Sequence, residues 1–244
     1  MTLPFHTVLA LRQMRYKGMG LIGPFAGVCV AVILVFIQLG FKNALTGSVL
    51  NFDRALIADI VITGSQFETI AFAPPWFARS IIYQAQGVAG VQRVVPVYVN
   101  LAQLRDPDHG DLLASRFIGF DPDDPVLALP VLARYVDTLR LPSVALIDER
   151  SRNQLTNVAD RVAHGRSERL YLQNPALPTA AHLDLVGTFS LGPDFTLMSS
   201  VVLSDLNFYR LFQLPPDRVS LGLVTTRPDA DPRRLRDELA ARLG

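Results

Sequence analysis

The chain has very few of the residues from which disulfides and metal sites are built. Its single cysteine, Cys29, excludes an intrachain disulfide and any site with several thiolate ligands. The four histidines share no metal-ligand spacing, and we interpret each as a surface residue: His6, His109, His164 and His182. The sequence therefore predicts no metal site.

Strong net charge is also absent. The 23 Lys and Arg residues nearly balance the 22 Asp and Glu residues, which leaves a formal net charge of +1. No stripe of basic residues with interleaved aromatic residues is present. The composition therefore gives no reason to expect a nucleic-acid partner.

The short motifs of common catalytic and nucleotide sites are missing. The sequence contains no Walker A loop, no G-x-G-x-x-G, no H-E-x-x-H and no G-x-S-x-G. We therefore predict no catalytic, cofactor-binding or metal-ligating residue, and no enzyme activity.

Three short stretches carry clustered carboxylates, and each has a structural interpretation. The stretches 106–111 (DPDHGD) and 121–125 (DPDDP) lack the full calcium-loop pattern, and their Pro and Gly residues are typical of turns. The stretch 148–152 (DERSR) predicts a solvated strand-to-helix junction whose ion pairs contribute under about 1 kcal/mol each. A secreted or anchored hydrolase that uses Asp106, Asp108 and Asp148 is the competing hypothesis.

One long apolar run is present, over residues 19–41, and no charged residue lies between Lys17 and Lys42. As a helix, about 23 residues would extend roughly 35 Å, which is enough to cross a hydrocarbon core of about 30 Å. A buried helix of a soluble protein rarely runs this far without a charge, and a cleaved signal peptide has a shorter apolar stretch. We predict a retained transmembrane helix over 19–41, with Gln38 as its one clearly polar residue.

The charges around this run predict its orientation. Arg12, Arg15 and Lys17 precede it closely, whereas only Lys42 follows it closely. Because positive charge is enriched on the cytoplasmic side, we predict that residues 1–18 are a cytoplasmic segment. Residues after about 42 would then lie outside, in the periplasm, and the protein in the bacterial inner (plasma) membrane.

Beyond the run, short alternating segments predict a β-α-β module. We expect a strand over 58–64, a helix over 74–85 and a long strand over 91–105 that lies at an edge or bulge where Pro96 interrupts it. A strand over 220–226 and a helix over 232–243 complete the module, with Asp231 as N-cap and with Leu235 and Leu239 facing inward. Trp76 and Phe77 either dock an aromatic helix face onto the sheet or contact a partner.

A second small α/β module is predicted between these halves, over 115–212. Its expected strands are 116–120, 144–148, 169–173, 183–189 and 201–203. Helices are expected after Asp148 and after Ser204, the second with Leu206, Tyr209 and Phe212 as its apolar residues. The predicted fold class is α+β, with one N-terminal transmembrane helix followed by a module over 42–114 and 213–244 that the segment 115–212 interrupts.

Five segments together resemble one protein family in order and spacing. They are VILVFIQLGFKNAL, ADIVITG, FIGFDPDDPVLALP, LSDLNFYRLF and LGLVTTRPDADP. They resemble the DevC-like (heterocyst-type) permease subunits of ABC exporters, in the wider MacB-like mechanotransmission class. The resemblance runs from about Leu9 to the last residue, and it implies that the β-α-β module is porter-like and periplasmic.

The resemblance also implies partners and a role. A separate cytoplasmic ABC ATPase subunit would hydrolyse ATP, and the permease would pass its motion to a periplasmic membrane-fusion (adaptor) protein and an outer-membrane channel. The cargo would be a lipid, a glycolipid or a similar compound exported from the cell. The full-length permease would be a homodimer embedded in membrane lipid.

Family members continue beyond this domain into three further transmembrane helices and a loop that docks the ATPase. We therefore expect the chain, which ends at Gly244, to be the N-terminal portion of a permease or a truncated gene product. The alternative is a stand-alone single-span membrane protein whose periplasmic domain binds a ligand or partner.

Overall fold

The computed structural model describes residues 22–65, 75–173, 181–191 and 197–243. The chain divides into two units, Met1–Gly47 and Ser48–Gly244, and each is considered by itself. The predicted cytoplasmic segment 1–18, which includes His6, and the first three residues of the predicted span lie outside the described residues.

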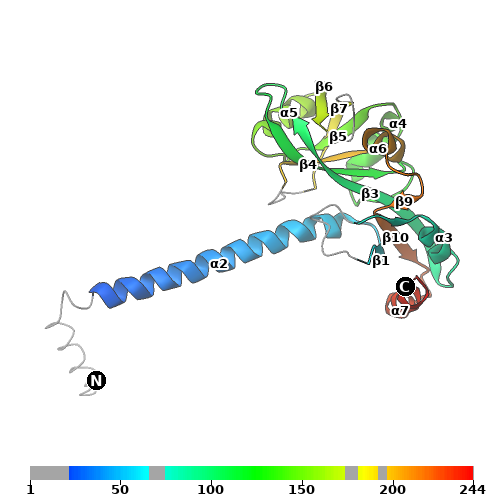
Figure 1. Ribbon diagram of the computed structural model, residues 1–244, viewed down its shortest axis with the longest axis horizontal. Helices are drawn as coiled ribbons and strands as arrows, with labels where there is room; N and C mark the ends of the chain where they lie inside the picture. Colours follow the sequence, from blue (N-terminus) through cyan, green and yellow to red (C-terminus); the bar gives the residue numbers. More distant parts are fainter. Residues whose placement is uncertain (1–21, 66–74, 174–180, 192–196, 244) are drawn as a thin grey trace, which may run out of the picture. The chain divides into compact units, whose positions relative to one another are not determined.

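The first unit contains most of one long helix, α2, which runs over Ile22–Ala55 (Figure 1). Its part Ile22–Lys42 has 21 residues, a mean hydropathy of 2.4 and no buried side chain. At 1.5 Å per residue this part extends about 32 Å, so it is long and apolar enough to cross a membrane. The apolar helix predicted over 19–41 is confirmed where the structure describes it, but α2 also continues well past the predicted exit at Phe41.

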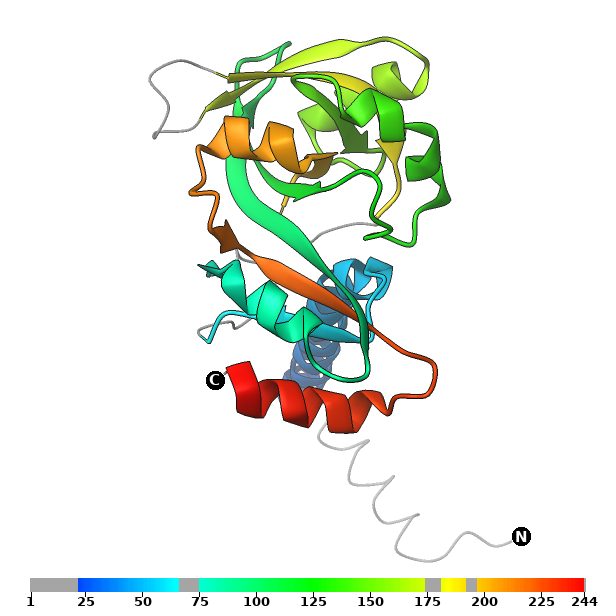
Figure 2. The same ribbon diagram turned by 90° about the vertical axis from the view of Figure 1, so that its right-hand side faces the viewer.

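The second unit is built on a mixed sheet of eight strands in the order β1-β10-β3-β4-β8-β5-β7-β6 (Figures 1 and 2). An additional pairing between β3 and β6 joins β3, β4, β8, β5, β7 and β6 into a closed ring of strands. The strands are β1 (Ile60–Thr63), β3 (Val91–Arg105), β4 (Leu112–Phe120), β5 (Val144–Asp148), β6 (Glu168–Gln173), β7 (Ala181–Phe189), β8 (Ser199–Ser204) and β10 (Leu221–Thr226). An apolar helix followed by a mixed α/β domain confirms the predicted fold class.

Strand β3 belongs to both parts of the sheet. Its residues up to Val97 pair with β10, and from Tyr98 onward it pairs with β4. Pro96 lies opposite Gly222 of β10 and precedes the β4 pairing, so its other side faces no described strand. The predicted edge position of Pro96 is confirmed, as expected for a residue that has no N–H to donate.

A serine side chain completes the pairing where β3 changes neighbours. The hydroxyl of the fully buried Ser220 accepts the N–H of Val99 at 3.0 Å and donates to the carbonyl oxygen of Val99 at 3.2 Å. The backbone N–H of Ser220 donates to the carbonyl oxygen of Val97 at 3.2 Å. One residue therefore satisfies backbone groups that no strand reaches at this point.

Two helices, α3 (Ser80–Gln86) and α7 (Pro232–Leu243), lie next to each other beside β10 (Figure 2). The Oδ1 atom of Asp231 accepts the N–H of Arg233 at 3.0 Å, and Leu235 and Leu239 are buried. The predicted N-cap and inward-facing residues of the last helix are confirmed.

The predicted helix over 74–85 begins too early. Phe77–Ala78 forms a short strand, β2, which pairs with β9 (Arg218–Val219), and α3 starts only at Ser80. Phe77 is buried and Trp76 packs against the same hydrophobic core. The aromatic pair does dock onto the domain, but from an extended segment rather than from a helix.

The ring of strands carries η2 (Pro130–Arg134) and the helices α4 (Val136–Leu139), α5 (Gln154–Ala163) and α6 (Asp205–Phe212). On α6 the predicted apolar set is partly wrong, because Leu206 is exposed and the buried apolar residues are Phe208, Leu211 and Phe212. The i, i+3, i+4 stripe of Phe208, Leu211 and Phe212 faces the core, as is typical of an amphipathic helix. Gly119 of β4 makes this packing possible, since a Cβ there would lie 2.6 Å from Phe208.

Two hydrophobic clusters hold the second unit together, and each includes residues from both predicted modules. The first joins Ile82 and Leu235 to Leu155 of α5. The second joins Leu221 of β10 to Leu146 of β5. Strand β4 crosses the predicted boundary between 114 and 115, and the module boundaries stay predictions.

Replacement of Ser220 by alanine tests the strand changeover. Ser220→Ala leaves the buried N–H and C=O groups of Val99 without their partner, so we expect a loss of about 1–3 kcal/mol in the free energy of unfolding. Urea unfolding of the chain in detergent measures it. The matched control is Ser167→Ala at an exposed site, expected within about 0.5 kcal/mol of the unmodified chain. A Ser220→Ala variant as stable as the control would contradict the assigned role.

Candidate functional site

The stretch 106–111 forms the turn between β3 and β4, as predicted. The carboxylate of the buried Asp106 accepts the N–H of Asp108 at 3.1 Å and the N–H of His109 at 3.0 Å, and it lies 2.7 Å from Nδ1 of His109. Burial alone would raise the pKa of Asp106, but these hydrogen bonds hold it below its ordinary value. In the described part of the chain, no three His, Cys, Asp or Glu residues are grouped so that they could hold a metal ion.

The stretch 121–125 is also a turn. The Oδ1 atom of Asp121 accepts the N–H of Asp123 at 3.1 Å, and its carbonyl oxygen accepts the N–H of Asp124 at 2.9 Å. Asp123 forms an ion pair with Arg140, and Asp124 forms one with Arg93. The carboxylates of this turn are therefore engaged by the protein itself.

The junction after β5 differs from its prediction at one residue. Glu149 and Arg150 are exposed as expected, but Asp148 is buried, with only 3% of its surface accessible. Its carboxylate accepts the N–H of Arg150 at 3.0 Å and a second backbone N–H from Leu191. Burial outweighs these bonds and raises the pKa of Asp148 to about 6.

The hydroxyl groups beside Asp148 do not form a nucleophilic site. Among the described residues, Ser151 Oγ donates to the carbonyl oxygen of Asp148 at 2.5 Å and lies 2.7 Å from Ser199 Oγ. Activation of a serine needs an adjacent base that is itself oriented. These two partners provide no such base.

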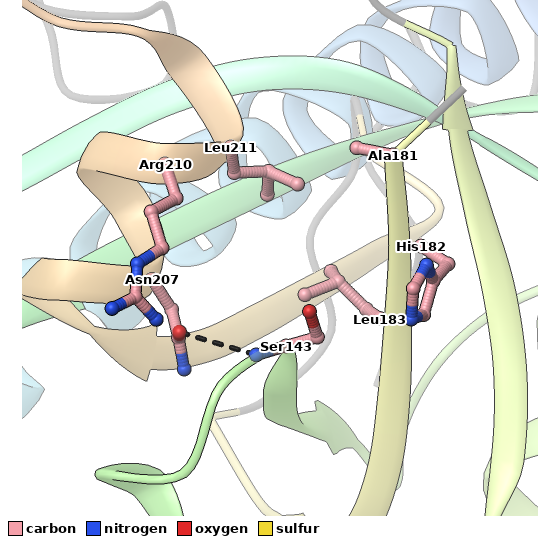
Figure 3. A pocket seen from close by; sticks show the side chains of 7 residues that line it. All are labelled: Ser143, Ala181, His182, Leu183, Asn207, Arg210 and Leu211. Atoms are coloured by element: carbon pink, nitrogen blue, oxygen red, sulfur yellow. Dashed lines mark hydrogen bonds between the residues drawn. The ribbon is translucent and has the colours of Figure 1, made fainter. Parts of the chain in front are cut away.

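A small cavity of about 150 Å³ lies between β7, α6 and the loop before β5 (Figure 3). In Figure 3, Leu183 and Ser143 point into it, whereas the ring of His182 lies on the other side of β7. Asn207 accepts the N–H of Ser143 at 3.2 Å and donates to the carbonyl oxygen of Leu141 at 2.8 Å, so its amide already fixes this loop. Small-molecule sites usually measure about 300–1,000 Å³, so this cavity is smaller than a typical ligand site and we do not take it as the candidate site.

The feature that stands out is the place where the C-terminal end of α2 is built into the second unit. Phe52 is 2% exposed and packs in the cluster that contains Ile118 and Phe120. The guanidinium carbon of Arg116, on β4, lies 5.2 Å from the centroid of the Phe52 ring, within the range of a cation–π contact. Partial burial raises the pKa of Asp53, and attraction to Arg116 opposes that shift.

The residues that follow α2 are hydrogen-bonded to two different parts of the domain. The carbonyl oxygen of Ala55 accepts the N–H of Ala128 at 2.7 Å, and the N–H of Ile57 donates to Val126 at 2.8 Å. The Oδ2 atom of Asp59 accepts the N–H and the hydroxyl of Thr226 at 2.7 and 2.8 Å. We call residues 52–59 with these contacts and Arg116 the helix anchor, and we take it as the candidate functional site.

The sequence predictions did not include the helix anchor. Arg116 was placed at the start of an apolar strand, and the strand in fact begins at Leu112, so the charge lies inside it. A charged residue within a strand of buried apolar residues is the signal that could have identified it. Phe52 gave no comparable signal, because nothing local distinguishes it from the other apolar residues after the span.

Comparison with known proteins identifies similar structures only. No family model matches the sequence, and no curated protein matches it. The periplasmic region of MacB from Actinobacillus actinomycetemcomitans is 14% identical and covers 68% of this chain and 72% of its own, with a TM-score of 0.44. The extracellular domain of the ABC-type transporter YknZ from Gram-positive bacteria is 15% identical and covers 69% and 82%, with a TM-score of 0.43. At such TM-scores the two likenesses carry no conclusion about this chain.

The buried Asp148 predicts a pH-dependent stability. Because its pKa is about 6 in the folded chain and 3.8 is the ordinary value, the folded state holds this proton more tightly. The contribution of Asp148 to the free energy of unfolding should therefore rise as the pH falls from about 7.5 through 6, by about 2 kcal/mol at pH 4.5.

Asp148→Asn should remove most of this rise, because an amide does not titrate. Urea unfolding at pH 7.5, 6 and 4.5 measures the difference between the two chains. Glu149→Gln, at the exposed neighbouring position, is the matched control and should keep the rise. An unchanged pH profile in Asp148→Asn would contradict the assignment.

Proposed function

We propose that the chain belongs to the permease (membrane) subunit of an ABC-type exporter. The observation that carries the proposal is α2, in which an exposed 21-residue apolar segment belongs to the same helix as the buried Phe52 of the second unit. An exposed apolar segment of this length is unfavourable in water and favourable in a bilayer. The ordered resemblance of five sequence segments to DevC-like permeases, in the MacB-like class, supports the same assignment.

The proposed location is the bacterial inner membrane, with the N-terminus in the cytoplasm and residues after about 42 in the periplasm. Arg12, Arg15 and Lys17 support this orientation, because they outnumber the single Lys42 on the other side of the apolar segment. The three N-terminal charges lie outside the described residues, so their support comes from the sequence.

We propose no catalytic step for this chain. Buried polar residues of the described domain such as Asp106, Asn207 and Ser220 form hydrogen bonds that support the local structure. ATP hydrolysis would belong to a separate cytoplasmic subunit.

The helix anchor supports a mechanical role for the domain. A movement of α2 caused by the ATPase would act on β4 through Phe52 and on β10 through Asp59 and Thr226. In this proposal the domain passes that movement to a periplasmic adaptor protein, and beyond it to an outer-membrane channel. The cargo class, a lipid or glycolipid, and the homodimeric full-length permease follow from the sequence resemblance alone.

Photo-crosslinking in living cells tests the adaptor contact. A photoreactive amino acid replaces Tyr83, Leu141, Tyr171 or Leu206, which are the most exposed large apolar side chains among the described residues of the domain. We expect at least one position to crosslink to a membrane-fusion adaptor, because an external contact surface buries such side chains. Arg234 on the outer face of α7 provides a polar control position.

The crosslinking experiment can also contradict the proposal. Crosslinks only to soluble periplasmic proteins, or to none at all, with an unchanged exported-lipid profile after deletion of the gene, would contradict the permease proposal. They would favour a stand-alone single-span protein whose external domain binds a ligand or partner.

A further inference from the structure

Arg116 is a charged residue at a buried strand position, where apolar residues are usual in proteins. It is 2% exposed, and the next two residues of β4, Phe117 and Ile118, are fully buried. Arginine is rarely buried to this extent unless other groups receive its charge. In this structure the Phe52 ring and the nearby Asp53 carboxylate, both at the end of α2, interact with it.

The contact between Arg116 and Phe52 is directional. Dispersion contacts between aliphatic side chains have little directional preference of their own, whereas a cation is attracted to the face of an aromatic ring. Successive residues of a helix lie about 100° apart around its axis, so rotation of the helix end by one residue would move the Phe52 ring away from the guanidinium. Arg116 therefore adds a directional contact to the hydrophobic packing that holds Phe52 in its cluster, and it favours one rotational position of the helix end.

We propose that Arg116 is a positioning residue that fixes the rotational register of the C-terminal end of α2 in the domain. Rotation of α2 would be transmitted to the ring of strands through Arg116, and this second statement rests on the proposed function. At Arg116, β4 pairs with Leu101 of β3 on one side and with Ser200 of β8 on the other. A displacement of Arg116 would act on both neighbouring strands.

Hydrogen exchange resolved along the sequence tests the register. In Arg116→Met the length of the side chain is roughly kept but its charge is removed, so the amides of residues 52–57 should exchange about tenfold faster. Exchange in β5, at the far side of β8, should not change. Phe52→Leu should give the same local effect, and the double variant should exchange no faster than the faster single variant, since both changes remove the contact between Arg116 and the Phe52 ring.

Two further variants provide a conservative replacement of Arg116 and a control at an exposed arginine. Arg116→Lys keeps the charge without the planar guanidinium, so it should restore part of the protection, and it replaces Arg116→Met if that variant fails to fold. Arg169→Met removes an exposed arginine that pairs with Asp184 elsewhere in the ring, and exchange of residues 52–57 should be unaffected.

The inference is overturned if Arg116→Met leaves residues 52–57 unchanged. It is overturned equally if exchange rises to the same extent in β5, or if the effects of the two single variants multiply. These results would leave the crosslinking test of the permease untouched, because that test depends on an external partner and not on Arg116.

Discussion

The long strand β3 is the constraint on which the architecture of the domain depends. It pairs with β10 before residue 98, with β4 from that residue onward and with β6 near its end. The last pairing closes the ring, and the change of partner leaves backbone groups that Ser220 must satisfy. Because one strand serves both parts, the two hydrophobic clusters extend across both, and the second unit is a single folded body.

The polar residues of the domain fall into two groups. Most buried ones serve local structure: Asp106 holds a turn and Asn207 holds the loop before β5. Arg116 differs, because its aromatic partner comes from a helix whose other end is apolar and exposed. In the proposed permease this is the point where a membrane helix and the external domain would act on each other. In this proposal the domain serves export by transmitting movement rather than by binding cargo.

Features of the fold that depend on neighbouring residues were predicted from the sequence. Features that depend on pairing between distant segments were not. The strands near 91–105 and 220–226 and the cap at Asp231 depend on neighbouring residues, and the structure contains them. Closure of the ring depends on Gln103 pairing with Gln173, which are far apart in sequence and share no local signal. Phe77 likewise pairs with Val219 in a short strand, at a place where the sequence predicted a helix. The charge of Arg116 within an apolar strand is visible in the sequence. Its contact with Phe52 depends on tertiary packing, which the alternation of apolar and polar residues does not encode.

The central claim is that α2 crosses a membrane and carries a domain on the outer side. Labelling of single cysteines with a membrane-impermeant maleimide on intact spheroplasts tests it most directly, in a chain whose native Cys29 is replaced by alanine. We expect Arg227→Cys, in the exposed loop after β10, to be labelled without detergent, and Leu34→Cys, within the apolar segment, to remain unlabelled. Labelling of Arg227→Cys only after lysis, or recovery of the chain in the soluble fraction, would contradict it.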